Sequence, residues 1–185
     1  MRYDLPRSLT VNNTEYEIRA DFREILDVLE IINDNELEER ERCFLALLFF
    51  YAGFDDMPAE DYQEALERCF WFINGGDDVH GQAKKQPKLM DWEKDFPLII
   101  APVNRVVGRE IRSESFFHWW SFLAAYMEIG ECTFAQVVHI RAEKSKGKKL
   151  SKFDEEYYRD NRELIDLPVK YTDADNELFK RLGGV

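Results

Sequence analysis

Residues 116–129, FFHWWSFLAAYMEI, form the most aromatic stretch of the chain and its strongest structural signal. Their spacing predicts a helix that Ser113 or Ser115 would cap and Gly130 would end. Large apolar side chains cover every face of this helix, which is typical of an element at the centre of a core. Trp and Tyr are also enriched at protein interfaces, so a partner groove is the second interpretation. The candidate partner-binding residues here are Phe116, Trp119, Trp120 and Tyr126.

The sequence before this stretch predicts a hairpin and three helices. Strand-forming residues surround Asn12-Asn13 in the segment 9–18, and this pair tolerates the positive φ of a tight hairpin turn. Asp21 has the position of a helix N-cap, with Glu24 where a capping box needs it. Apolar residues at helical spacing predict helices over about 22–32, 36–52 and 59–74. The apolar stripe of the third helix would consist of Tyr62, Leu66, Cys69, Phe70 and Ile73.

The remaining segments complete a mainly α fold, a compact multi-helix domain with a small N-terminal β-hairpin. Glycine-rich residues 75–88 predict a mobile loop or linker. We divide the chain into an acidic part (1–74), this linker and an aromatic-rich helical part (89–185), with the two parts packed as one domain. Further helices are expected over 90–107 (kinked at Pro97 and Pro102), 133–144, 151–161 and 173–182, with residues 164–168 irregular.

The charge distribution disfavours nucleic acid as a partner. The formal net charge is −12, and residues 1–80 hold 20 Asp and Glu against 7 Lys and Arg. Affinity for phosphate backbones comes chiefly from Lys and Arg, so the acidic surface repels nucleic acid at long range. The longest apolar run, 43–54, is shorter than the roughly 20 residues that span a bilayer. With no apolar signal segment at the start, we expect a cytoplasmic protein without a membrane partner.

No familiar catalytic or metal-binding motif is present in the sequence. It contains no P-loop, no zinc-type histidine pair and no nucleophile elbow. We interpret His118 as a packing histidine, and Cys43 and Cys69 as reduced, buried thiols. Asp91 and Asp95 are spaced to share one helical face, where solvated helix charges are the main interpretation and a divalent-ion or acid–base pair the alternative. We therefore predict no enzyme activity, no cofactor and no metal.

A basic segment, 141–152, could form a small phosphate-compatible patch. It lacks interleaved aromatic side chains, which single-strand binders generally use for stacking. A connector that contacts an acidic protein surface is the competing interpretation. The candidate partner-binding residues in this segment are Lys146, Lys148 and Lys149.

Four segments resemble one known family. They are DFREIL at 21–26, MDWEKDFPLIIAPVNRVVGREIR at 90–112, FHWWSFLAAYMEIGECTFAQVVHIR at 117–141 and KGKKLSKFDEEYYRDNRELIDL at 146–167. They occur in the same order as in the bacteriophage "gene product fifteen" family, which is encoded in tail-gene clusters of long-tailed phages and prophages of Gram-positive bacteria. The resemblance covers nearly the whole chain.

The resemblance implies a tail-assembly chaperone that binds the tape-measure protein while tail-tube subunits polymerise around it. It brings no catalytic residues. Client contacts would come from residues 116–126 and 144–152. Two rival functions stay open. One is a structural component of the virion, in the tail or in head completion, and the other is a nucleic-acid-binding protein or nuclease that would use Asp91, Asp95 and the basic segment 141–152. Binding of the tail-tube protein and assembly into a homo-oligomer stay open as well.

Overall fold

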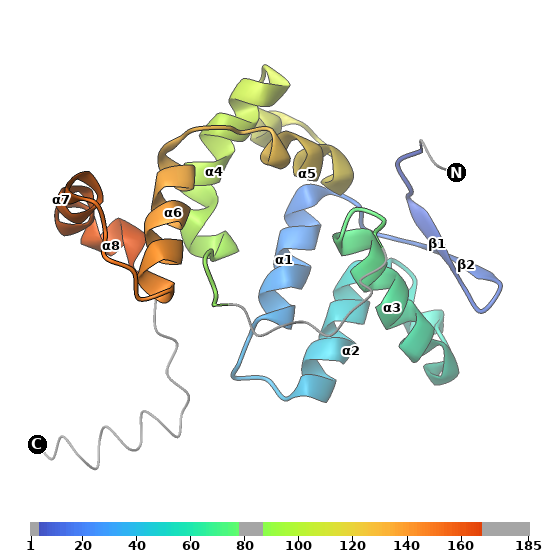
Figure 1. Ribbon diagram of the computed structural model, residues 1–185. Helices are drawn as coiled ribbons and strands as arrows, with labels where there is room; N and C mark the ends of the chain where they lie inside the picture. The colour runs from blue at the N-terminus through green and yellow to red at the C-terminus, as the bar shows by residue number, and fades with distance from the viewer. Residues whose placement is uncertain (1–3, 78–86, 168–185) are drawn as a thin grey trace, which may run out of the picture.

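The computed structural model describes residues 4–77 and 87–167, and this part of the chain is mainly α-helical with one small β-hairpin, as predicted (Figure 1). The strands are β1 (Ser8–Val11) and β2 (Thr14–Glu17). The α-helices are α1 (Phe22–Ile32), α2 (Glu39–Phe50), α3 (Tyr62–Ile73), α4 (Trp92–Val107), α5 (Trp119–Met127), α6 (Thr133–Ser145), α7 (Lys152–Asp160) and α8 (Arg162–Ile165). Short 3-10 turns are η1 (Phe54–Asp56), η2 (Ala59–Asp61) and η3 (Ile111–Ser113).

The predicted hairpin and its turn are confirmed. β1 and β2 pair antiparallel, with Val11 opposite Thr14. Asn12 and Asn13 have φ values of 45° and 66°, which are the left-handed values that a tight hairpin turn requires. The hairpin packs on the helices, because Val11 is fully buried and the Asn12 amide donates to Asp61 at 2.6 Å. This packing stabilises a hairpin that would be marginal alone.

A stack of aromatic rings joins α1, α4 and α5 in the main core. The Phe22 ring lies 5.0 Å from the Phe122 ring and almost parallel to it, and Phe96 of α4 lies on Phe22 at 6.4 Å. Trp119 stacks on Phe122 at 5.5 Å. The core extends in sequence from Leu9 to Phe134, so the acidic first part and the aromatic second part share it.

Asp21 is the N-cap of α1, as predicted, and it also fixes a distant segment. Its carboxylate accepts from the Arg23 N–H at 3.0 Å, from the Arg23 guanidinium and from the Phe117 N–H at 2.8 Å. The Trp119 N–H donates to the Ala20 carbonyl at 2.8 Å. These bonds attach the entry of α5 to the entry of α1. Although burial raises the pKa of Asp21, the bonds from Arg23 and Phe117 bring it below its ordinary value.

The predicted start of α5 was wrong. Neither Ser113 nor Ser115 caps it; the cap is His118, whose Nδ1 accepts from the Trp120 N–H at 3.0 Å. The helix cannot begin earlier, because the backbone around His118 is extended and bridges to the segment before α1. The packing interpretation of His118 is confirmed, since it is 4% exposed and its Nε2 lies 3.0 Å from the Pro6 carbonyl oxygen. Burial lowers the pKa of this imidazole.

Three details of α2 and α3 differ from the sequence prediction. α2 is shorter than 36–52, and it ends before Tyr51 because Tyr51 bridges to Ile18. Phe70, which we predicted in the apolar stripe of α3, is 38% exposed, and Phe72 is buried in its place. Of the two predicted buried thiols, Cys69 is fully buried and Cys43 only half-buried.

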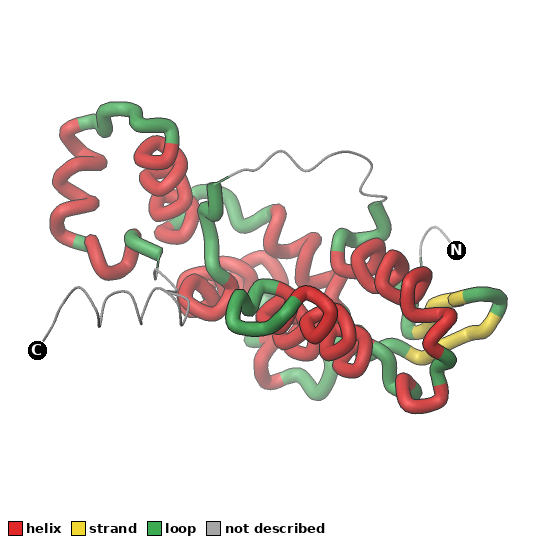
Figure 2. Tube along the Cα trace, turned by 90° about the horizontal axis from the view of Figure 1, so that it is seen from below, coloured by secondary structure: helices red, strands yellow, loops and turns green. Residues whose placement is uncertain are grey.

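The helices α6, α7 and α8 form a second, smaller core. Val137, Ile140 and Ile165 are fully buried in it, and Leu98 of α4 packs against them. Both views place these three helices at the end of the molecule opposite the hairpin (Figures 1 and 2). The prediction that residues 164–168 are irregular was wrong for Leu164 and Ile165, which are the last two residues of α8.

Helix α4 runs through Pro97 and Pro102 without ending at either. Two predictions fall outside the described residues, namely the central part of the loop, 78–86, and the helix expected over 173–182. Across residues 4–77 and 87–167, no helix combines the length and the apolar character needed to cross a membrane.

Candidate protein-binding groove

The aromatic candidates on α5 lie in or against the core. Trp119 is 1% exposed and its indole donates to the Ile73 carbonyl at 2.9 Å. Trp120 is half-buried and its indole donates to the Phe72 carbonyl at 2.8 Å. The two indoles therefore attach α5 to the end of α3, and the ring of Trp119 offers no surface to a partner.

The other two aromatic candidates are half-buried. Arg7 lies over the Phe116 ring at 4.1 Å, next to the N-terminal segment. The Tyr126 hydroxyl contacts the Met90 sulfur at 3.4 Å, and its ring lies 5.3 Å from the ring of Trp92. Tyr126 thus supports two residues at the start of α4, and these two residues line the groove described below.

The basic candidates are exposed at the end of α6 and in the connector to α7. Lys146 and Lys148 lie 3.4 and 3.5 Å from Glu143, and Lys149 is exposed beside them. Lys144 is paired with Asp166 at 2.7 Å. Arg141 points away from this segment into the protein interior, so the basic patch is smaller than the sequence suggests.

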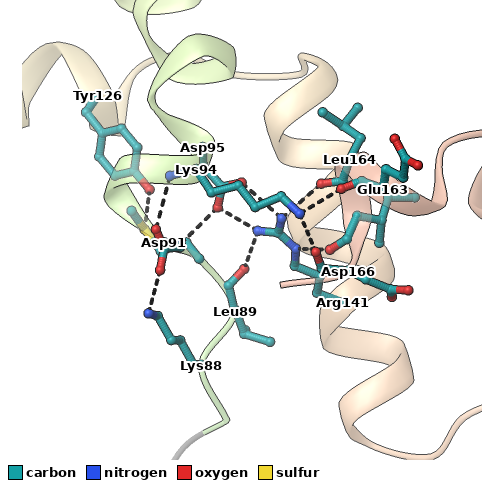
Figure 3. A network of polar contacts seen from close by, with 12 residues as sticks. Lys88, Leu89, Asp91, Lys94, Asp95, Tyr126, Arg141, Glu163, Leu164 and Asp166 are labelled. Atoms are coloured by element: carbon teal, nitrogen blue, oxygen red, sulfur yellow. Dashed lines mark hydrogen bonds and ion pairs between the residues drawn. The ribbon is translucent and has the colours of Figure 1, made fainter. Parts of the chain in front are cut away.

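Asp91 and Asp95 act in a capping and ion-pair network at the start of α4 (Figure 3). Asp91 is the N-cap: its carboxylate accepts from the Lys94 N–H at 3.0 Å and from the Lys88 ammonium at 2.7 Å. Asp95 accepts from the Asp91 N–H at 2.9 Å, so each aspartate satisfies one backbone N–H group at the start of the helix. Asp95 also binds the Arg141 guanidinium at 2.6 and 2.9 Å.

Arg141 extends this network to the C-terminal helices. Its guanidinium donates to the carbonyls of Leu89, Leu164 and Ile165 as well as to Asp95. Lys94 donates to the carbonyls of Glu163 and Asp166 from the opposite side (Figure 3). We call Asp95, Arg141 and Lys94 with these partners the polar joint; it ties α4, α6 and α8 together. Within the described residues, no cluster of three or more His, Cys, Asp or Glu side chains suits a metal ion.

A groove of about 550 Å³ lies between α1 and the start of α4, next to the polar joint. Its apolar lining is half-buried and consists of Leu26, Leu29, Met90, Trp92 and Phe96. Positions 26 and 29 are one turn apart on α1, so they form a continuous ridge. The groove is therefore an apolar depression that is open to solvent, which is the usual form of a protein-binding or ligand-binding site.

The rim of the groove is acidic. Asp27, Glu30 and Glu93 are exposed on it, and Asp91 and Lys88 form an ion pair beside them. Among the described residues that line the groove, four are acidic and one, Lys88, is basic. Carboxylates at the edge of a low-dielectric surface concentrate a negative potential, which favours a cationic ligand.

Comparison with protein families confirms the resemblance that the sequence showed. The sequence profile of the family described as "Bacteriophage Gp15 protein" matches residues 1–167. The chain belongs to the Gp15 family. It is therefore a phage protein, and every described residue, the groove and polar joint included, lies within the Gp15 region. No curated protein and no solved structure matches the chain.

Sequence reasoning missed the groove and the role of Arg141. The groove forms where α1 meets a segment about sixty residues later in the chain, and periodicity along one helix carries no information on such a meeting. The sequence did hold a signal for the burial of Arg141, because this residue follows the apolar residues Val137, Val138 and Ile140 on a helix. A buried arginine needs a carboxylate partner.

Proposed function

We propose that this phage protein is a non-enzymatic tail-assembly chaperone that binds the tape-measure protein in the host cytoplasm. The observation that carries the proposal is the open apolar groove between α1 and α4. A chaperone of a long helical client has to cover the apolar ridges of that client reversibly. A hydrophobic groove does so when an amphipathic helix of the client binds in it. Family membership supports the phage context.

The acidic candidates support the non-enzymatic part of this proposal. Asp91 and Asp95 were the alternative acid–base pair, but their carboxylates are engaged by helix N–H groups, Lys88 and Arg141. Both carboxylates are thus committed to structural contacts, and using either of them on a substrate would break those contacts.

The test is co-expression with the tape-measure protein of the same gene cluster, followed by affinity capture and size-exclusion chromatography. We expect a soluble complex, whereas the tape-measure protein alone should be insoluble. We also expect the chaperone to be missing from purified virions by mass spectrometry. The opposite pair of results, no complex and retention in virions, would favour the structural-component alternative.

A further inference from the structure

We propose that the groove between α1 and α4 receives an amphipathic helix whose apolar ridge is flanked by Lys or Arg side chains. Only the identity of the client rests on the proposed function. The inference itself concerns the chemistry of the segment that the groove would bind. The groove itself and its charges belong to the described residues.

The volume of the groove is of the order of one helical turn. An α-helix with its side chains is about 10–12 Å across and rises about 5.4 Å per turn, so a turn occupies roughly 400–600 Å³. The groove of about 550 Å³ matches roughly one such turn. Its lining offers Leu26 and Leu29 on one wall and Met90, Trp92 and Phe96 on the other, so three or so apolar side chains of a helix would lie between them.

The charges on the rim of the groove determine which side chains can flank the apolar ridge of the bound helix. Asp27 and Glu30 lie on the α1 wall and Glu93 on the α4 wall, and all three are exposed. A helix with Lys or Arg on both sides of its apolar ridge would place a cation near each wall. A helix with Glu in these positions would be repelled, and such like-charge contacts provide selectivity between partners.

The protein's own basic segment is a poor candidate for this occupant. In residues 144–152 the Lys side chains surround a single large apolar residue, Leu150, and Gly147 has a φ of 66°, which interrupts a helix. A second copy of the chain therefore offers cations from this segment but no apolar ridge. We commit to a segment of another protein.

The test uses a designed, fluorescein-labelled peptide of 20 or so residues with Leu at helical spacing and Lys elsewhere, and a matched peptide with Glu in place of Lys. Fluorescence polarisation at low salt should show at least about tenfold tighter binding of the Lys peptide to the full chain. Replacing Asp27 and Glu30 by Lys should weaken this binding about tenfold or more, since both are exposed and the fold should not change.

The matched control replaces two exposed carboxylates outside the groove, Glu60 and Glu67, by Lys, which changes the net charge equally. We expect it to alter affinity by less than about threefold. Leu29→Ala tests the apolar lining and should weaken binding about fivefold, with circular dichroism to verify the fold.

Three results would overturn the inference: equal binding of the two peptides, equal losses in the groove and control variants, or a dimer in sedimentation that only the groove variant dissociates. The last result would assign the groove to a contact between copies. The inference and the proposed function fail separately. A tape-measure complex that survives the groove substitutions would leave the chaperone role intact and remove the groove from it. Selective peptide binding without a tape-measure complex would support the groove inference and contradict the chaperone role.

Discussion

Asp95 on α4 and Arg141 on α6 form a bidentate ion pair inside the protein, with nitrogen–oxygen distances of 2.6 and 2.9 Å. Asp95 is 0% exposed and Arg141 6%. The remaining guanidinium donors bind backbone carbonyls of Leu89, Leu164 and Ile165. A buried pair satisfied in this way fixes the relative position of the two helices, because either charge left alone would be costly.

We expect Asp95→Ala to destabilise the fold by about 3–5 kcal/mol, because it leaves the Arg141 charge buried without a partner. Urea unfolding followed by circular dichroism measures this change. The control is a double-mutant cycle with Arg141→Met: the double variant should lose clearly less stability than the two single variants added together. A loss of under about 1 kcal/mol in Asp95→Ala would mean that the pair is hydrated in solution.

Trp119→Ala should destabilise the fold by about 3–5 kcal/mol, because it removes a large ring from the centre of the aromatic stack. Trp119→Phe is the matched control; it keeps a ring and loses the bond to Ile73, so its effect should be smaller. Trp120→Ala should also destabilise, since this half-buried ring packs on Phe72. If both alanine variants melted like the parent, the core interpretation of α5 would be wrong.

Stability should fall in acid partly through Asp21. Its pKa is lower in the folded chain than its ordinary value of 3.8, so the folded state binds fewer protons than the unfolded state. The contribution of Asp21 to the free energy of unfolding is therefore complete above pH 3.8, and it is lost as the pH falls through the lower pKa of the folded state. Asp21→Asn should be less stable than the parent at neutral pH, and the difference should shrink in urea titrations toward pH 2. A constant difference across this range would contradict the assignment.

Replacing Lys146, Lys148 and Lys149 together by Ala should leave the melting temperature nearly unchanged. These side chains are exposed, and pairs such as those with Glu143 are screened by water and salt. Differential scanning fluorimetry measures the effect. A large loss of thermal stability would show that the connector between α6 and α7 has a structural role that its exposure does not suggest.

Gly76→Ala should destabilise the end of α3 by about 1–3 kcal/mol, because a left-handed backbone disfavours a side chain. Gly76 has a φ of 90°, and an added Cβ would meet the Trp120 ring at 3.0 Å. Gly53→Ala is the control, since Gly53 has a φ of −110° and its added Cβ would meet no described residue within 4 Å apart from its chain neighbours. Thermal melts of the two variants should differ; equal melts would argue that the Gly76 turn adapts to a side chain.

The helix positions were largely predictable because they depend on local chemistry. The Asn12-Asn13 turn, the Asp21 cap and the apolar spacing of α1 and α6 are each encoded within a few residues. The errors occurred where distant segments meet. The start of α5 depends on a backbone bridge between Asp21 and His118, which are almost a hundred residues apart.

The candidate site was less predictable than the fold. Aromatic composition drew attention to Trp119, but composition alone does not distinguish a buried ring from an exposed one. The groove instead uses ordinary residues, such as Leu29 and Trp92, that are spaced like core residues but stay half-buried, because no further element among residues 4–77 and 87–167 covers them. That outcome depends on the tertiary arrangement of α1 and α4.

The small core of α6–α8 has a consequence for how the molecule opens. Its three fully buried side chains, Val137, Ile140 and Ile165, are far fewer than those of the main core. It is linked to the main core by Leu98, by Phe134 and Val138 of α6, and by the polar joint. Segments with few buried contacts exchange their amide protons through local opening, at a lower free energy than global unfolding. The backbone amides of α6–α8 should therefore exchange with deuterium as one cooperative group, earlier than those of α1 and α5, and Asp95→Ala should accelerate that group selectively.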